Sequence, residues 1–274
     1  MNLGGVFPFG QPSTERPPRR PAGPADAFVL GVYPSALHVR WQPPAYWAGR
    51  QARTVSAMAV DVEPVVFWDG ANPDPSTLIA AWKDAVGFVD GDDVGCDGHV
   101  GDVATNGSSG LLVSALTLEP LGIDPASVWM TDAVPWLFVK YGTKTKREQG
   151  DVLAEVYNPF ALVQGRQLAT LPRRPTSVVA HAAEHERSRL RSELLESGAP
   201  VVLTFGEEAR QVLERIVDAA AGPPTRKLDA EDYGSVGSIT VEGRNIAWHA
   251  LVHPGQRALR WTRAHGLWTG TWAD

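Results

Sequence analysis

Residues 128–136 read VWMTDAVPW, an apolar run typical of a buried β-strand, with a single carboxylate at Asp132. No Lys or Arg lies nearer to this aspartate along the chain than Lys140. Burying an unpaired carboxylate is costly, so such a residue is usually hydrogen-bonded, protonated or functional. The stretch therefore predicts a core strand that carries a polar site at its carboxyl end.

Three more apolar runs end in turn or polar residues in the same way, at 27–35, 199–209 and 244–255. Helix-like patterns separate the four runs, at 76–88, 108–122, 181–198 and 207–222. Continuous apolar strands that alternate with amphipathic helices are typical of a parallel sheet covered on both faces. We expect an α/β fold, namely a three-layer α/β/α domain with a central, mainly parallel four-stranded sheet.

Residues 1–26 are rich in Pro and Gly, and we expect them to form a flexible N-terminal segment ahead of one domain over 27–274. The net charge of −6 gives no global attraction for nucleic acid, although a local basic groove is compatible with it. The single cysteine, Cys96, excludes a disulfide framework and a cysteine-ligated iron–sulfur cluster.

No run of about 18 apolar residues and no signal-peptide core is present, so we expect a cytoplasmic monomer without a membrane partner. The acidic segment DGDDVGCDGHVGD (90–102) lacks the ordered ligand spacing of a calcium loop. We therefore expect neither a metal nor a cofactor.

Ligands bind parallel sheets at the carboxyl ends of the strands, which directs attention to four segments near those ends. They are GVYPSA (31–36), NGSSGLL (106–112) with LGIDPASVWMTDAV (121–134), VVLTFGEEA (201–209) and HALVHPGQR (249–257). In this order they resemble the motifs of the uracil-DNA glycosylase superfamily over roughly residues 27 to 265. The resemblance implies a DNA partner and an enzyme that flips a base out of the duplex before cutting its N-glycosidic bond.

Asp132 stands where the resemblance implies an Asn that reads the edge of uracil. A carboxylate cannot donate to O4 of uracil, but it can accept from the exocyclic amine of cytosine. A protonated Asp132, or one that shares a proton with N3, could also satisfy N3 of cytosine. This exchange predicts an amino-bearing pyrimidine, provided that Asp132 faces a cleft and is not held in a buried ion pair. The alternative is a structural aspartate that caps the following turn.

Ser35 stands where one branch of the family has a Tyr that excludes 5-methyl groups. The smaller side chain leaves room at C5 and favours a 5-substituted cytosine, such as the hydroxymethylated or glucosylated bases of bacteriophages. Some prokaryotic glycosylases of the superfamily act in antiphage defence. The alternative is that GVYPSA is a strand end with a Pro-initiated turn.

Tyr33 replaces the family aspartate that activates water. A phenol, with an ordinary pKa of about 10, is a poor general base at neutral pH. Water could instead be held by Tyr33, Ser35 or backbone carbonyls, and His38 is a further candidate base unless it is a surface histidine. His253 matches the family histidine that donates a hydrogen bond to O2 of the departing base, unless it only marks a strand-to-turn boundary.

An aromatic ring should stack on the flipped base. Tyr46 and Trp68 are our preferred candidates over Trp47 and Phe67, although each could instead belong to the core. Asn106 begins a helix and could contact a phosphate or the base.

Basic residues are expected to contact DNA phosphates, unless they are ordinary solvated loop charges. Arg257 takes the place of the family wedge that fills the vacated stack. The clusters comprise Lys140, Lys144, Lys146 and Arg147, then Arg173 and Arg174, then Arg257, Arg260 and Arg263.

The leading hypothesis is a monofunctional DNA glycosylase that releases a 5-substituted cytosine. Three alternatives stay open: a uracil-type repair glycosylase, a non-catalytic DNA-binding relative, and a nucleotide or nucleoside enzyme that shares only the sheet architecture.

Overall fold

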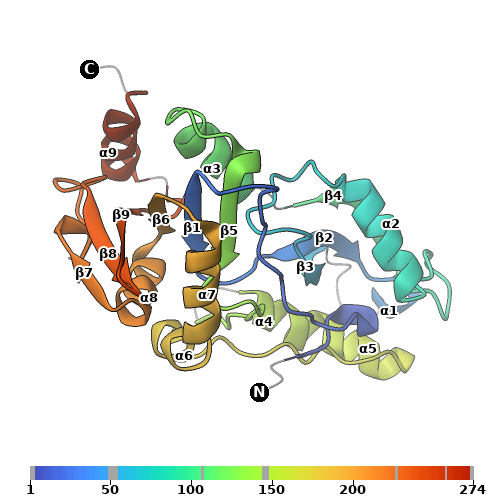
Figure 1. The fold of residues 1–274 in the computed structure, drawn as a ribbon. Helices are drawn as coiled ribbons and strands as arrows, with labels where there is room; N and C mark the ends of the chain where they lie inside the picture. Colours follow the sequence, from blue (N-terminus) through green and yellow to red (C-terminus); the bar gives the residue numbers. More distant parts are fainter. Residues whose placement is uncertain are drawn as a thin grey trace.

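Figure 1 shows the computed structural model, which describes residues 4–48, 55–105, 108–143, 148–225, 228–256 and 258–271. The strands are β1 (Ala27–Gly31), β2 (Ala36–Gln42), β3 (Ser56–Val62), β4 (His99–Ala104), β5 (Val128–Asp132), β6 (Val201–Phe205), β7 (Ala219–Ala221), β8 (Gly237–Val241) and β9 (Arg244–Leu251).

The helices are α1 (Ala45–Ala48), α2 (Pro75–Ala85), α3 (Ser108–Val113), α4 (Gln149–Val152), α5 (Asn158–Gln164), α6 (Val178–His185), α7 (Arg187–Ser197), α8 (Glu207–Ile216) and α9 (Leu259–Thr269). Wider π-helical turns over Ser114–Leu118 and Leu153–Tyr157 continue α3 and α4. Short 3₁₀ turns lie at Pro8–Gly10, Pro125–Ser127 and Pro223–Thr225. Within the described part of the chain, no helix has both the length and the apolar content that a bilayer crossing needs.

The larger sheet has six strands in the order β5-β1-β6-β9-β8-β7. β5, β1, β6 and β9 run parallel and coincide with the four apolar runs of the sequence. The hairpin partner β8 and then β7 extend this sheet in antiparallel pairing, so the expectation of four strands was wrong. Glu242 and Gly243 join β8 to β9 with positive φ angles of 49° and 78°, as a tight two-residue hairpin turn requires. The fold is thus mixed α/β with a mostly parallel sheet.

Successive residues of the parallel strands face opposite sides of this sheet, and both sides are buried. Phe28 and Leu30 of β1 pack in one cluster with α6, α7 and α8, whereas Ala27 and Val29 pack in a second cluster with α3. Trp268 of α9 packs against the second cluster. Burial on both faces explains why these strands read as continuous apolar runs rather than as alternating ones.

A second, antiparallel sheet of three strands, in the order β3-β2-β4, was not expected from the sequence. It lies beside α2 at the right of Figure 1. Its core is aromatic, with Trp41, Trp82, Tyr157 and Phe160 buried together. The seven residues of β2 alternate between apolar and polar types only in part, which gives a weak strand signal.

The N-terminal segment is extended but not free, which corrects the expectation of a flexible leader. Phe7 and Phe9 are buried in the core of the small sheet. Arg19 and Met130 exchange two backbone hydrogen bonds of 2.8 and 2.9 Å, so the segment covers the outer edge of β5. In Figure 1 this segment is the dark blue trace that crosses the front of the molecule. The anchoring residues Phe9 and Arg19 lie between prolines, and Phe7 directly precedes one, so the Pro-rich composition concealed them.

Candidate active site

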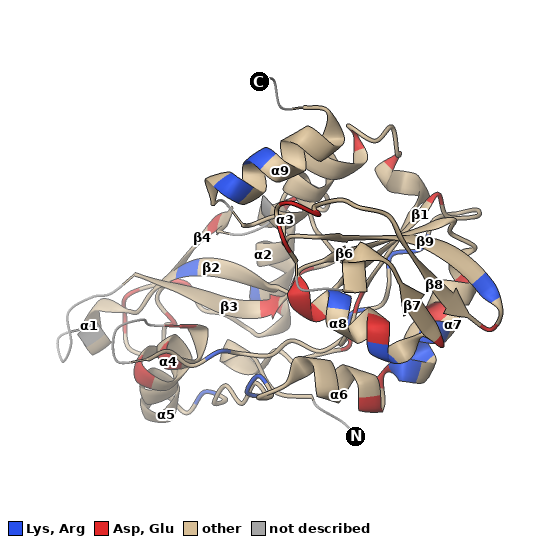
Figure 2. Ribbon diagram, turned by 90° about the vertical axis from the view of Figure 1, so that its left-hand side faces the viewer, with Lys and Arg blue, Asp and Glu red and all other residues tan. Residues whose placement is uncertain are grey.

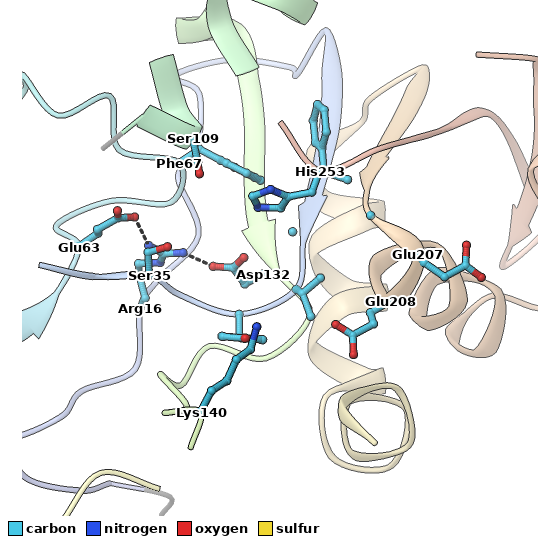
Figure 3. Close-up of a pocket in the computed structure, with 15 residues that line it drawn as sticks. Arg16, Ser35, Glu63, Phe67, Ser109, Asp132, Lys140, Glu207, Glu208 and His253 are labelled. Carbon is cyan, nitrogen blue, oxygen red and sulfur yellow. Dashed lines mark hydrogen bonds and ion pairs between the residues drawn. The ribbon is translucent and has the colours of Figure 1, made fainter. Parts of the chain in front are cut away.

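A cavity of about 440 Å³ opens where the four parallel strands end. Its lining includes Tyr33 and Ser35 beyond β1, Asp132 at the end of β5, Gly206 beyond β6 and His253 beyond β9. These residues come from four separate motifs of the sequence, and parallel pairing brings their strand ends to one edge of the sheet. Figure 3 shows this cleft.

Asp132 forms a buried ion pair with Arg16 of the N-terminal segment. Arg16 Nη2 donates to Asp132 Oδ2, while Nη1 donates to Glu63 Oε2 at 3.4 Å and to the carbonyl of Val65 at 3.3 Å. The side chains of Arg16, Glu63 and Asp132 are only 4, 6 and 5% exposed. Asp132 therefore does have a cationic partner, but that partner lies 116 residues earlier in the chain. Both contacts with carboxylates are drawn as dashed lines in Figure 3.

This ion pair restricts what Asp132 can do. It contradicts a freely adjustable base-reading carboxylate, because a proton on Oδ2 would displace the hydrogen bond from Arg16. The second oxygen lies on the other side: a Cβ atom built on Gly31 would be 2.4 Å from Asp132 Oδ1 and 3.2 Å from Phe67 Cζ. Since Gly31 and Phe67 both line the cavity, Oδ1 is the acceptor on the cleft side.

The alternative role of Asp132 as a cap for the following turn finds little support. The backbone N–H groups of Ala133 and Val134 donate to the carbonyls of Gly31 and Val32, at 3.1 and 3.0 Å. The carbonyls at this strand end are also occupied, because Arg189 of α7 donates to those of Asp132 and Ala133 at 2.9 and 3.1 Å. The end of β5 is therefore fixed from both sides by groups other than the Asp132 carboxylate.

His253 lies with its ring directed into the cleft, near Asp132 and Phe67 (Figure 3). The N–H of Gly255 donates to Nδ1 at 3.1 Å, so the neutral ring carries its proton on Nε2. Desolvation lowers the pKa of His253 below its usual 6.5, Lys140 adds to this, and the charge of Asp132 opposes it. The His253 ring lies at the open cleft, but the protein packed against its inner side removes water from it, and this desolvation lowers its pKa. His253 can therefore offer an Nε2–H donor at neutral pH.

Tyr33 lies between apolar and cationic groups at the cleft rim. Its ring meets Phe138 edge-on with 6.0 Å between centroids. Lys140 Nζ lies 5.9 Å, and the guanidinium carbon of Arg174 5.7 Å, from the centroid of the Tyr33 ring. Such cations are attracted to the face of an aromatic ring.

A smaller cavity of about 160 Å³ adjoins the cleft on the side of Tyr33 and Ser35. The two cavities share Tyr33, Ser35 and Lys140. His38 lines this smaller cavity and not the main cleft, and its Nδ1 lies 2.9 Å from the carbonyl oxygen of Ala36. His38 is thus poorly placed to act as a base in the main cleft. The smaller cavity is lined by Tyr33, Pro34, Ser35, Ala36, His38, Ala59, Leu137, Phe138, Val139, Lys140, Glu148 and Gln149.

The structure places neither preferred aromatic candidate, Tyr46 or Trp68, at the cleft, where Phe67, next to Trp68 in sequence, lies instead. Trp68 is buried in the core of the small sheet, where Tyr46 also packs. Phe67 lines the cleft, meets Phe205 with 5.8 Å between ring centroids, and has a positive φ of 52°. A Cβ on Gly110 would lie 1.9 Å from the carbonyl oxygen of Phe67, so glycine in the NGSSGLL motif lets α3 approach this loop.

The expected DNA contacts are only partly within the described structure. Figure 2 shows the basic residues of α9 in blue. Of these, Arg260 is exposed in the first turn of α9, with its guanidinium 4.9 Å from the centroid of the Trp261 ring. The preceding residue, Leu259, is 73% exposed, and it was not anticipated. Five expected residues, Asn106, Lys144, Lys146, Arg147 and Arg257, lie outside the described residues.

The two glutamates at the cleft, Glu207 and Glu208, are each paired with a neighbouring arginine. Glu208 forms an ion pair with Arg174, and Glu207 accepts hydrogen bonds from Arg210, from Gln211 and from the backbone of Leu228. No group of three or more potential metal ligands occurs in the ranges that the structure describes. The chemistry that the cleft offers is therefore one carboxylate oxygen, one imidazole donor, hydroxyl groups, a cation and an aromatic ring.

Arg16, Glu63 and Leu259 were missed by the sequence analysis, and no motif signals them. Phe67 was considered, but only the structure separates it from Trp68. No protein-family model matches the chain, and no curated protein is similar enough to be counted as a relative.

Proposed function

We propose that the protein is a monofunctional DNA glycosylase that flips a pyrimidine into this cleft and hydrolyses its N-glycosidic bond. The observation that supports this most is the meeting of an imidazole donor, a carboxylate oxygen and an aromatic ring in one cavity, from His253, Asp132 and Phe67. The cavity volume of about 440 Å³ lies in the range of small-molecule sites and suits one nucleotide. The larger sheet would then be the middle layer of an α/β/α domain.

In the proposed reaction, water adds to the anomeric carbon as the bond to the base nitrogen breaks. The base leaves with the bonding electrons, and negative charge develops on O2. A neutral His253 donates its Nε2–H to this oxygen, and a preorganised donor at developing charge is usually a leading catalytic contribution. The proton that the added water loses passes through solvent to the released base, so that both products are neutral. The ring of Phe67 stacks on the base. Tyr33 and Ser35 place the water through their hydroxyl groups.

The ion pair with Arg16 changes the proposed role of Asp132. Its Oδ2 is occupied, so recognition rests on Oδ1 as an acceptor without a proton of its own. Such an oxygen suits the exocyclic amine of cytosine and faces the O4 carbonyl of uracil unfavourably. The sequence-based prediction required an Asp132 outside any buried ion pair, and the pair with Arg16 does not meet that condition. We propose the preference for an amino-bearing pyrimidine on the acceptor Oδ1 alone, without a protonated Asp132.

The smaller cavity favours a base with a substituent at C5. It continues the cleft beyond Ser35, where the family resemblance implies a bulky ring. Most of its lining is apolar, and His38, Lys140, Glu148 and Gln149 supply the polar groups that would contact hydroxyl groups of such a substituent. We therefore propose a hydroxymethylated or glucosylated cytosine, as in phage DNA, and a role in antiviral defence.

The test is incubation with duplexes that contain uracil, cytosine, hydroxymethylcytosine or glucosylated hydroxymethylcytosine, with abasic sites measured by alkaline strand cleavage. Release from the substituted cytosines alone supports the proposal. Release of uracil alone supports a repair glycosylase. DNA binding without release of any base supports a non-catalytic relative. In Asp132→Asn, which keeps an acceptor for Arg16 and gains an amide donor, we expect the preference to move toward uracil.

A further inference from the structure

A third concave surface, of about 660 Å³, lies next to the cleft and gathers three of the basic residues that the sequence placed in two separate clusters, Lys140, Arg173 and Arg174. Two chain segments form it, Val139 to Tyr141 and Arg173 to Thr176, together with Glu148. Lys140 lines both this groove and the main cleft, so the two adjoin. Figure 3 shows Lys140 with its amine directed toward the cleft.

Backbone hydrogen bonds fix these two segments side by side. Val139 N–H donates to the carbonyl of Pro172 at 3.0 Å, and Arg174 N–H donates to that of Val139 at 2.9 Å. This isolated parallel bridge pairs Val139 with Arg173, which fixes Lys140 close to Arg173 although the two lie far apart in sequence. Both side chains are exposed. The groove therefore presents cations from a fixed backbone rather than from two independent loops.

The groove is cationic in a protein that is acidic overall. Its lining contains Lys140, Arg173 and Arg174 but one carboxylate, Glu148, while the whole chain carries −6. Arg174 is partly neutralised by Glu208. A local positive field of this kind attracts an anionic ligand even when the net charge repels it.

Aromatic rings accompany these cations. The guanidinium carbon of Arg173 lies 5.3 Å from the centroid of the Tyr141 ring, and Lys140 and Arg174 flank the ring of Tyr33. Cations beside rings along a groove are typical of surfaces that follow a nucleic-acid strand. A planar guanidinium group can also donate two parallel hydrogen bonds to two oxygens of one phosphate.

We propose that this groove binds the backbone phosphates of the DNA strand next to the flipped nucleotide, with Lys140 at the boundary and Arg173 further out. The inference takes its DNA partner from the proposed function, but it concerns affinity and not base release. It joins the expected phosphate contacts of Lys140 and Arg173 into one groove that follows the strand, separate from the expected contacts at α9.

The experiment measures binding of a fluorescent duplex of ordinary bases by anisotropy, between about 50 and 200 mM salt. Each phosphate contact contributes about −0.9 to the slope of log affinity against log salt. We expect Lys140→Gln and Arg173→Gln each to reduce the magnitude of the slope by about 1, and the double variant by about 2. Arg187→Gln on α7 and Arg215→Gln on α8 remove equally exposed cations outside the groove and should leave the slope unchanged.

The proposal that the groove binds phosphates is contradicted if the double variant keeps the wild-type slope. It is also contradicted if the wild-type protein does not bind DNA at the lowest salt. An equal loss of slope in the two control variants also overturns it, because the effect would then be general charge. Groove-dependent binding without release of any base leaves this inference intact and removes the proposed glycosylase activity. Base release by the wild type together with an unchanged slope in the double variant removes this inference and leaves the proposed glycosylase activity intact. Circular dichroism of each variant checks that the fold is retained.

Discussion

Arg16, from a segment that precedes the first strand, forms a buried ion pair with Asp132 at the carboxyl end of β5. The same guanidinium contacts Glu63 just beyond β3. One side chain thus connects the N-terminal segment, the small sheet and the large sheet at the wall of the cleft. The segment is part of the site, because its removal would leave two buried carboxylates without their shared cation.

Replacing Arg16 by Met should destabilise the protein by about 3–5 kcal/mol, since it leaves buried charge unpaired. Urea unfolding of the variant and the wild type at neutral pH measures this loss.

A matched control lies four residues further along the same segment. Arg20 pairs with Glu196 at 3.6 Å, but both side chains are more than half exposed. Arg20→Met should therefore change the free energy of unfolding by less than about 1 kcal/mol. Equal effects of the two substitutions would show that the pair with Asp132 is not a buried ion pair in solution.

Gly31→Ala should displace the Asp132 carboxylate, which lies directly beside Gly31. The added Cβ would lie 2.4 Å from Asp132 Oδ1, so Asp132 must move, and the Phe67 ring 3.2 Å away limits relief on the other side. We expect a stability loss of about 1–3 kcal/mol from overpacking and a larger loss of base release. Gly101→Ala in β4 is the control, because nothing lies within 4 Å of its added Cβ. Retention of full activity in Gly31→Ala would argue against a fixed position for Asp132.

The four parallel strands could be predicted because burial on both faces leaves continuous apolar runs, and their pairing then fixed which motif ends would meet. The hairpin of β8 and the small sheet were missed because buried and less buried residues alternate along their strands, which therefore form no continuous apolar run. Arg16 could not be assigned, since nothing local marks a contact across 116 residues. Phe67 and Trp68 are adjacent in sequence, and only the direction of the backbone determines that the Phe67 ring lies at the cleft and the Trp68 ring in the core.

The lowered pKa of His253 predicts an acid limit for base release. The folded state favours the neutral ring, so this contribution to stability is complete above the unfolded value near 6.5 and is lost as pH falls through the lower folded value. Protonation of Nδ1 would also remove its hydrogen bond from Gly255. We expect the rate of base release to be constant from about pH 7 to 8 and to fall with a midpoint below 6.5.

Proton NMR of the His253 ring should give the same midpoint as the rate, and His253→Gln identifies its resonance. The control is His185→Gln, which removes a histidine of α6 that does not line the cleft and should leave the pH profile unchanged. A rate that declines at a pH well above the titration of His253 would assign the limit to another group.

Ser35→Tyr should close the passage between the cleft and the smaller cavity. Ser35 is exposed, and its backbone carbonyl accepts from Glu63 N–H at 2.9 Å, so the larger side chain can be added without breaking the local backbone contact. If a C5 substituent occupies the smaller cavity, the new ring will lower kcat/KM for a 5-substituted cytosine by about 10- to 200-fold relative to the unsubstituted base. Ser35→Ala keeps the passage open and should preserve the wild-type ratio. An unchanged ratio in Ser35→Tyr would mean that the substituent leaves the cleft by another side.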